Sequence, residues 1–143
     1  MLKSVDPILT GDLLKILCDM GHGDEIVLTD ANFPAETVAQ RLVRLPGIGA
    51  DRVAGAVLSV MPLDDFVEAP AAAMACPDGR PPVYDDFDRE LASANGGAVT
   101  MEEIDRFAFY ERAQSAYAVV STGERRLYAN LILKKGVLRE NPA

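Results

Sequence analysis

The apolar and polar positions of this chain follow two kinds of periodicity. Apolar residues recur every three or four positions in four segments that predict helices: 10–20, 51–61, 84–94 and 107–116. Short apolar runs that predict buried strands cover 25–29, 41–45, 117–121 and 127–133. The small apolar run 69–75 fits either a strand or a helix. Helices that alternate with buried strands predict an α/β protein, a three-layer α/β/α sandwich-like single domain (1–143) with a central mixed sheet.

Polar residues and glycines predict where some of these elements end. The Thr10 side chain can cap the first helix by accepting a hydrogen bond from an otherwise unpaired backbone amide. Gly21 can end that helix in a left-handed turn. Gly96 and Gly97 predict a turn after the helix predicted over 84–94, which is amphipathic and acidic.

Composition removes several classes of function. The chain has 143 residues, of which 22 are acidic and 14 are basic, so its formal net charge is -8. This balance argues against nucleic-acid binding, which needs clustered Lys and Arg. No apolar run approaches the roughly 20 residues of a membrane helix. The residues 1–6 lack the layout of a signal peptide, so we expect a cytoplasmic protein that does not bind membranes.

Metal and nucleotide sites are not predicted. Cys18 and Cys76 are far apart and are expected to be reduced, and His22 is the only histidine, so a zinc site lacks ligands. Neither Gly21-His22-Gly23 nor Gly47-Ile48-Gly49 has the full G-x-G-x-x-G spacing of a dinucleotide fingerprint. We therefore expect no cofactor and no metal.

His22 is the first candidate for chemistry. It lies between two glycines directly after the first predicted helix, where its ring is uncrowded by neighbouring side chains. Imidazole is the side chain that exchanges protons most readily near neutral pH. The same position also suits a structural histidine at the negative end of the helix dipole.

Four further residues are candidates for ligand binding. Asp30 follows a predicted strand, where α/β proteins bind ligands, although it also suits a turn. Arg106 begins an Arg- and aromatic-rich stretch that suits a sugar, or equally a helix with core aromatics. Tyr128 and Asn130 are two positions apart in a predicted strand and so would share one face. That face could also be an ordinary exposed one.

Several ordered blocks of sequence point to one family: 21–26, 30–34, 106–114, 122–125, 128–130 and 133–137. In these blocks the chain resembles bacterial L-fucose mutarotases, whose wider family also contains D-ribose pyranase. The resemblance runs from residue 1 to about 137 and is weaker between 40 and 100. Ribose-specific relatives tend to have G-H-T-D where this chain has G-H-G-D, and they lack the Arg- and aromatic-rich stretch.

The resemblance implies an isomerase that interconverts the α and β anomers of L-fucose, or of a close aldose, by acid-base ring opening. His22 matches the family's proton donor, and Asp30, Arg106, Tyr128 and Asn130 match its substrate-binding positions. Relatives form homo-oligomers, commonly decamers, with sites near subunit contacts. The aromatics after Arg106 are expected to contact the sugar's C6 methyl. The alternatives are a D-ribose pyranase, which interconverts pyranose and furanose forms, and a non-catalytic monosaccharide-binding regulatory module.

Overall fold

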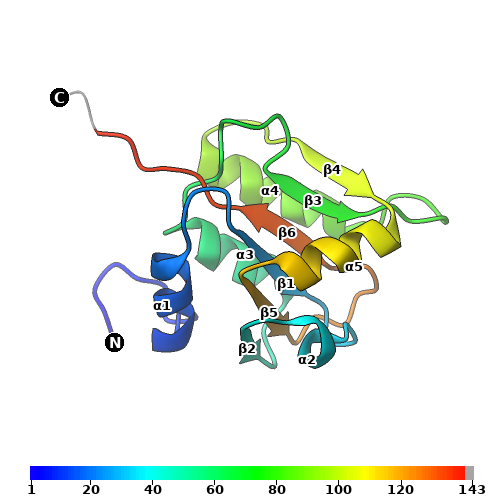
Figure 1. Cartoon of the computed structure of the whole chain (residues 1–143), viewed down its shortest axis with the longest axis horizontal. Coiled ribbons are helices and arrows are strands. Elements are labelled where there is room, and N and C mark those ends of the chain that lie inside the picture. The colour runs from blue at the N-terminus through cyan, green and yellow to red at the C-terminus, as the bar shows by residue number, and fades with distance from the viewer. Residues whose placement is uncertain (141–143) are drawn as a thin grey trace.

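A mixed six-stranded sheet organises the computed structural model, which describes residues 1–140 (Figure 1). The strands lie in the order β2-β5-β1-β6-β3-β4. Neighbours pair in parallel except β6, which runs antiparallel to both β1 and β3. At the end of the sheet where β1, β3 and β4 finish, which we call the carboxyl end, β6 therefore begins. The strands are β1 (Glu25–Thr29), β2 (Leu42–Leu45), β3 (Ala71–Met74), β4 (Met101–Ile104), β5 (Ala118–Thr122) and β6 (Leu131–Lys134).

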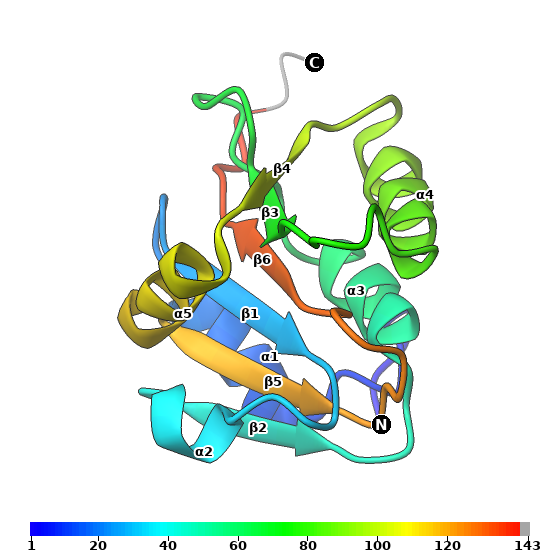
Figure 2. The same cartoon turned by 90° about the vertical axis from the view of Figure 1, so that its right-hand side faces the viewer.

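Helices cover both faces of the sheet (Figure 2). The larger apolar cluster contains side chains of α1 (Gly11–Asp19), α3 (Ala50–Leu58) and α4 (Val83–Asn95). The smaller cluster, on the other face, contains side chains of α2 (Ala35–Val38) and α5 (Arg106–Ser115). The result is a three-layer α/β/α arrangement, so the predicted fold class is confirmed.

The strands supply both clusters by alternation. In β1, the buried residues Ile26 and Leu28 belong to the larger cluster, and Val27 between them belongs to the smaller one. In β6, Leu131 and Ile132 divide in the same way. Successive side chains of a strand point to opposite faces, so a strand covered on both faces must be apolar throughout.

Most predicted elements are present, and the departures have local reasons. The run 69–75 contains a strand, β3. Strand β4 was not predicted, because its sequence is half acidic and it pairs on one side only, at the edge of the sheet. The four-residue helix α2 is too short to show a period. The predicted strand 127–133 begins later in the structure, at the first residue of β6, Leu131. Tyr128 cannot belong to it, because its φ of 64° lies outside the extended region.

The ends of α1 separate a correct prediction from a wrong one. The side chain of Thr10 accepts a hydrogen bond from the amide of Leu13 at 3.3 Å, as predicted. Gly21 does not adopt a left-handed conformation; the positive φ, 87°, falls at Gly23. The chain therefore reverses after His22 rather than before it.

The turn at Gly96, after α4, has the expected left-handed φ of 72°.

The longest described helix, α4, has 13 residues. Among residues 1–140, no helix combines the length and the apolar composition that crossing a membrane would require.

The loop after β5 lies against the loop after β2 with no room for a side chain. The amide of Gly123 donates to the carbonyl of Ile48 at 2.8 Å. A β-carbon added to Gly123 would lie 2.7 Å from the α-carbon of Gly47, which is backbone and cannot rotate away. This contact joins the segment that leads towards Tyr128 to the segment that begins α3.

We predict that Gly123→Ala lowers the free energy of unfolding by about 1 to 3 kcal/mol, because the two loops must separate. Gly11→Ala is the matched control: a β-carbon there meets nothing within 4 Å, and alanine favours the first turn of α1. Urea unfolding of both variants measures the difference. Equal midpoints for the two variants would contradict the proposed steric role of Gly123.

Candidate functional site at the carboxyl end of the sheet

A small pocket of about 230 Å³ opens at the carboxyl end of the sheet. Four of the five predicted site residues line it. Asp30 follows β1, Arg106 is the first residue of α5 after β4, and Asn130 directly precedes β6. Because β6 is antiparallel, its beginning lies where the parallel strands end. The pocket is lined by Asp30, Asn32, Met74, Arg106, Tyr110, Leu127, Tyr128 and Asn130.

Asp30 and Asn130 hold each other at the base of this pocket. The side-chain carbonyl of Asn130 accepts the amide of Asp30 at 2.8 Å, and its Nδ2 donates to the Asp30 carboxylate at 3.3 Å. The other carboxylate oxygen accepts the amide of Asn32 at 2.9 Å. Both side chains are buried, with 6% and 3% exposed. The two residues therefore form a fixed polar base rather than independent surface groups.

Burial raises the pKa of Asp30 above its ordinary value. The hydrogen bonds from the Asn32 and Phe33 amides and from Asn130 oppose this rise, whereas the nearby Glu124 carboxylate adds to it. A carboxylate with a raised pKa accepts a proton more readily than an exposed one. Asp30 is therefore suited to accept hydrogen bonds from hydroxyl groups.

Arg106 provides the positive charge at the mouth of the pocket. It begins α5, whose N-terminal cap is the Asp105 side chain, which accepts the amides of Phe107 and Ala108. Its guanidinium lies 5.0 Å from the centre of the Phe107 ring, and within residues 1–140 it forms no ion pair. Its donors are thus free to bind oxygen atoms of a ligand.

Tyr128 reaches the pocket from a loop. The prediction that Tyr128 and Asn130 share one face of a strand is therefore wrong. The backbone of Tyr128 is left-handed. Two residues later, the amide of Asn130 donates a hydrogen bond back to the carbonyl of Tyr128 at 2.7 Å. This tight fold brings both side chains to one cavity, although neither lies in a strand. A non-glycine residue at positive φ costs free energy and often occurs at functional sites.

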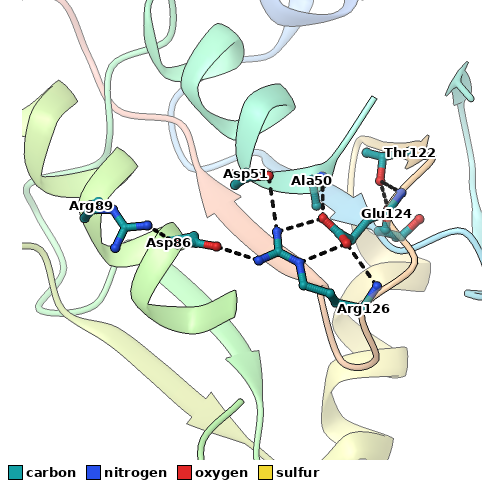
Figure 3. A network of polar contacts seen from close by, with 8 residues as sticks. Ala50, Asp51, Asp86, Arg89, Thr122, Glu124 and Arg126 are labelled. Atoms are coloured by element: carbon teal, nitrogen blue, oxygen red, sulfur yellow. Dashed lines mark hydrogen bonds and ion pairs between the residues drawn. The ribbon is translucent and has the colours of Figure 1, made fainter. Parts of the chain in front are cut away.

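An ionic network anchors the loop that carries Tyr128 and Asn130 (Figure 3). The Glu124 carboxylate is 7% exposed and accepts the backbone amide and the guanidinium of Arg126. It also accepts the amide of Ala50 at 3.2 Å, at the N-terminus of α3, where the helix dipole favours negative charge. Arg126 continues to Asp86 of α4 at 2.5 Å and to Asp51 of α3 at 3.3 Å.

Sequence reasoning missed several residues of this region. The sequence analysis named Glu124 only within block 122–125 of the family resemblance. Its role in anchoring the loop depends on partners far along the chain. Met74 and Leu127, which give the pocket its apolar wall, were not singled out. Of the aromatics after Arg106, Tyr110 lines the pocket, but Phe109 is fully buried in the core, so the predicted contact with a ligand is wrong for Phe109.

His22 does not lie in the pocket. It precedes β1, whereas Asp30 follows it, so the two residues lie at opposite ends of the sheet. The ring of His22 contacts Asp64 at 3.0 Å and packs against Phe66, with 4.9 Å between ring centroids. A five-residue strand separates its ends by about 13 Å at roughly 3.3 Å per residue. One copy of the chain therefore does not bring together all five predicted site residues.

A metal centre is not evident in the described part of the chain. Among residues 1–140, no three His, Cys, Asp or Glu side chains gather closely enough to hold an ion. Cys18 and Cys76 are both free.

A small pocket at the carboxyl end of an α/β sheet, with charged and polar side chains beside an apolar wall, is typical of a protein that binds a small polar ligand. The chain belongs to the RbsD / FucU transport protein family, whose model matches residues 3–138. Its fucose mutarotase relative in Homo sapiens is 46% identical over 150 residues, which cover 99% of this chain and 97% of that protein. The family resemblance predicted from the sequence is confirmed.

Solved structures agree with this assignment. The crystal structure of the fucose mutarotase of Streptococcus pneumoniae in complex with L-fucose superimposes with a TM-score of 0.90 at 39% identity, over 96% of this chain and 100% of that chain. The structure of Bacillus subtilis RbsD complexed with D-ribose superimposes with a TM-score of 0.72 at 28% identity, over 97% of this chain and 100% of that one.

The ionic network generates a prediction about acid stability. The hydrogen bond from the Arg126 side chain is the largest cause that lowers the pKa of Glu124, from 4.5 to about 2. The unfolded chain therefore takes up this proton first as the pH falls. Stability contributed by Glu124 is present above pH 4.5 and is lost between about 4.5 and 2, by roughly 3 kcal/mol.

We expect Glu124→Gln to remove most of this pH dependence, as measured by urea unfolding at intervals between pH 5 and 2.5. Glu36→Gln is the control, because Glu36 pairs with Arg44 at the exposed surface and such pairs contribute little. An unchanged slope in Glu124→Gln would show that other carboxylates cause the acid sensitivity.

Proposed function

We propose that this protein is an isomerase that interconverts the α and β anomers of L-fucose by acid-base catalysed ring opening. The observation that carries the proposal is the pocket itself. It gathers Asp30, Arg106, Tyr128 and Asn130 from three distant parts of the chain. These are the four positions at which the family resemblance places substrate contacts, and a homologue at 39% identity is described in complex with L-fucose.

The proposed reaction needs one proton donor and one proton acceptor. The ring oxygen of the cyclic sugar gains a proton, the anomeric hydroxyl loses one, and the bond between the ring oxygen and C1 breaks. The open aldehyde rotates about its C1–C2 bond and closes on the other face of the carbonyl. Electrons and atoms balance without an oxidant, a reductant or a transferred group. Positioned acid-base groups typically accelerate such steps by about 10²- to 10⁴-fold.

The pocket suits the sugar on both its polar and its apolar sides. Arg106 donates to hydroxyl oxygens and Asp30 accepts from hydroxyl groups, and charge-assisted hydrogen bonds of this kind hold orientation well. Tyr128 lines the same cavity, and its hydroxyl is our candidate to relay the second proton. Met74 and Leu127 border the same cavity and, rather than the buried Phe109, offer an apolar contact for a C6 methyl group.

We infer that the proton donor, His22, comes from a second copy of the chain. Proton transfer requires about 2.6–3.2 Å between heavy atoms, and the sheet holds His22 far from the pocket of its own copy. Exposed apolar side chains support contact between copies at both places. Phe66, beside His22, is 65% exposed, and Phe107 and Leu127, beside the pocket, are each 67% exposed. A surface that binds a different surface of the next copy generates a closed ring when the rotation between copies closes, and an open filament when it does not.

The homo-oligomer follows from this inference, whereas its size does not. A decamer, which the resemblance implies, and a cytoplasmic location stay predictions. A D-ribose pyranase activity is the second candidate, because RbsD complexed with D-ribose shares the fold at 28% identity. A non-catalytic monosaccharide-binding module is the third.

Anomer exchange measured by saturation-transfer NMR separates these candidates. We expect L-fucose to exchange faster than D-ribose by at least about tenfold, because one methyl in an apolar pocket is worth about 10- to 200-fold. L-Galactose, which has the hydroxyl pattern of L-fucose but a polar C6, is the matched control and should fall between them.

Three outcomes would contradict the proposal. Equal rates for D-ribose and L-fucose would favour the pyranase. Binding of L-fucose without accelerated exchange would favour the binding module. Wild-type exchange in His22→Ala, in place of an expected loss of about 10²- to 10⁴-fold, would remove His22 from the mechanism.

A further inference from the structure

The segment that follows β6 runs beside the turn between α1 and β1 (Figure 1). The amide of Gly23 donates to the carbonyl of Lys135, and the amide of Lys135 donates to the carbonyl of Asp24, each at 2.9 Å. Lys135 belongs to block 133–137 of the family resemblance, to which the proposed reaction gives no role. Its backbone nevertheless lies against the turn that carries His22.

The side chain of Lys135 reaches the end of α1. Its ammonium donates to the carbonyl of Leu17 at 2.7 Å and to that of Met20 at 2.5 Å. The last carbonyls of a helix have no partner within the helix, and the negative end of the helix dipole attracts a cation. Lys135 thus caps α1 from a position 115 residues after Met20.

Helix α1 ends without the usual left-handed glycine. Many helices end with a glycine at positive φ, where the backbone amides that follow satisfy the free carbonyls. Here Met20 has a φ of −59° and a ψ of 136°, and the first positive φ after the helix falls at Gly23. The Lys135 ammonium bonds to the carbonyls instead, so the chain does not have to reverse at Gly21.

Residues 21–24 then form a tight turn with His22 at its second position. The amide of Asp24 donates to the carbonyl of Gly21 at 3.1 Å, and the Asp24 carboxylate accepts the amide of Gly21 at 2.8 Å. Gly23, third in the turn, has a φ of 87°, which glycine adopts without strain. Lys135 holds this turn at its start through α1 and at its end through the backbone bonds to Gly23 and Asp24.

The backbone on either side of Lys135 is fixed as well. Leu63 forms a β-bridge with Lys135, and the amide of Gly136 donates to the carbonyl of Pro62 at 2.8 Å. A β-carbon added to Gly136 would lie 2.3 Å from the carbonyl oxygen of Leu63, so the two segments touch at the backbone. The ammonium therefore reaches α1 from a rigid base.

We propose that Lys135 is a positioning residue for His22: by capping α1 it delays the reversal of the chain until Gly23 and so places the imidazole on the turn. This inference rests on the proposed function of His22. A cap at Gly21 would reverse the chain before His22 and start its side chain from a different backbone position. In the turn as it stands, the His22 side chain is 44% exposed, as a donor to a sugar held by another copy must be.

Lys135→Met tests the proposal, because methionine keeps an unbranched apolar side chain and removes the ammonium. We expect kcat for L-fucose to fall by about 10- to 100-fold, since a displacement of about 1 Å can cost about 100-fold. KM should stay within about twofold of wild type, because the sugar contacts lie at the opposite end of the sheet. Lys135→Arg, which keeps a charged donor, should recover most of kcat. Lys15→Met is the control, since Lys15 pairs with Asp19 on the exposed side of the same helix.

Co-expression with other variants assigns the defect to one half of the shared site. Lys135→Met mixed with Arg106→Ala should recover about a quarter of wild-type exchange, because that share of the sites pairs an intact His22 turn with an intact pocket. Lys135→Met mixed with His22→Ala should recover nothing, because no copy then carries an intact turn. A merely structural loss of stability would not distinguish the two mixtures.

Alanine at the two glycines of the turn tests the cap independently of catalysis. Gly21 has no positive φ, and a β-carbon there meets only the Asp24 carboxylate, at an ordinary 3.7 Å. We expect Gly21→Ala to unfold at the urea midpoint of the wild-type protein. Gly23→Ala should unfold at lower urea, because alanine is strained at a φ of 87°.

Several results would overturn the proposal. They are a wild-type kcat in Lys135→Met, a raised KM at unchanged kcat, and recovery in neither mixture when His22→Ala and Arg106→Ala restore each other. A midpoint for Gly21→Ala as low as that of Gly23→Ala would also overturn it, even if Lys135→Met does not fold. Full exchange in His22→Ala would instead reject the proposed function of His22, whatever Lys135→Met shows.

Discussion

The direction and length of β1 constrain everything else in the site. This central strand begins just after His22 and ends just before Asp30, so the two residues must lie at opposite ends of the sheet. No rotation of side chains can bridge a span of about 13 Å at roughly 3.3 Å per residue. A reaction that needs both residues therefore needs two copies of the chain. Under the proposed function, contact between copies is part of the catalytic machinery.

A buried carboxylate holds each half of the proposed site, and neither of the two carboxylates lines the pocket. At the carboxyl end, Glu124 ties the loop of Tyr128 and Asn130 to the N-terminus of α3 and, through Arg126, to α4 (Figure 3). At the opposite end, Asp64 faces the ring of His22. A buried charge is costly unless donors surround it, and donors that surround it become fixed in turn. Each carboxylate therefore holds the groups that donate to it in fixed positions.

The layered fold could be predicted from the sequence because it is encoded locally. Buried strands and amphipathic helices each show a period of their own, and β1 appears at its predicted bounds. Strand β4 could not be predicted, because an edge strand with one partner has no need of apolar residues. The backbone at Tyr128 could not be predicted either, because its left-handed conformation is imposed by the anchored loop rather than by its own preference.

The candidate site was predicted less completely, and for a different reason. Asp30 could be identified because it follows a buried strand, where α/β proteins bind ligands. Arg106 was singled out by its Arg- and aromatic-rich stretch, because the strand before it, β4, has no apolar pattern. Tyr128 and Asn130 were expected on one face of a strand that does not extend to them. Their grouping with Asp30 came from the family resemblance. Glu124 and Met74 owe their roles to contacts between distant segments, which no local pattern records. The separation of His22 from Asp30 was implicit in the sequence, since one strand lies between them.

Mixing two inactive variants tests the shared site most directly. His22→Ala lacks the donor and Arg106→Ala lacks a sugar contact, so each alone should exchange L-fucose slowly. When the two are co-expressed in equal amounts, about a quarter of the sites in a mixed ring should combine an intact His22 with an intact pocket and recover that share of wild-type exchange. Mixed assemblies that stay as inactive as the separate variants would contradict the account, because they would place His22 and the pocket in the same copy.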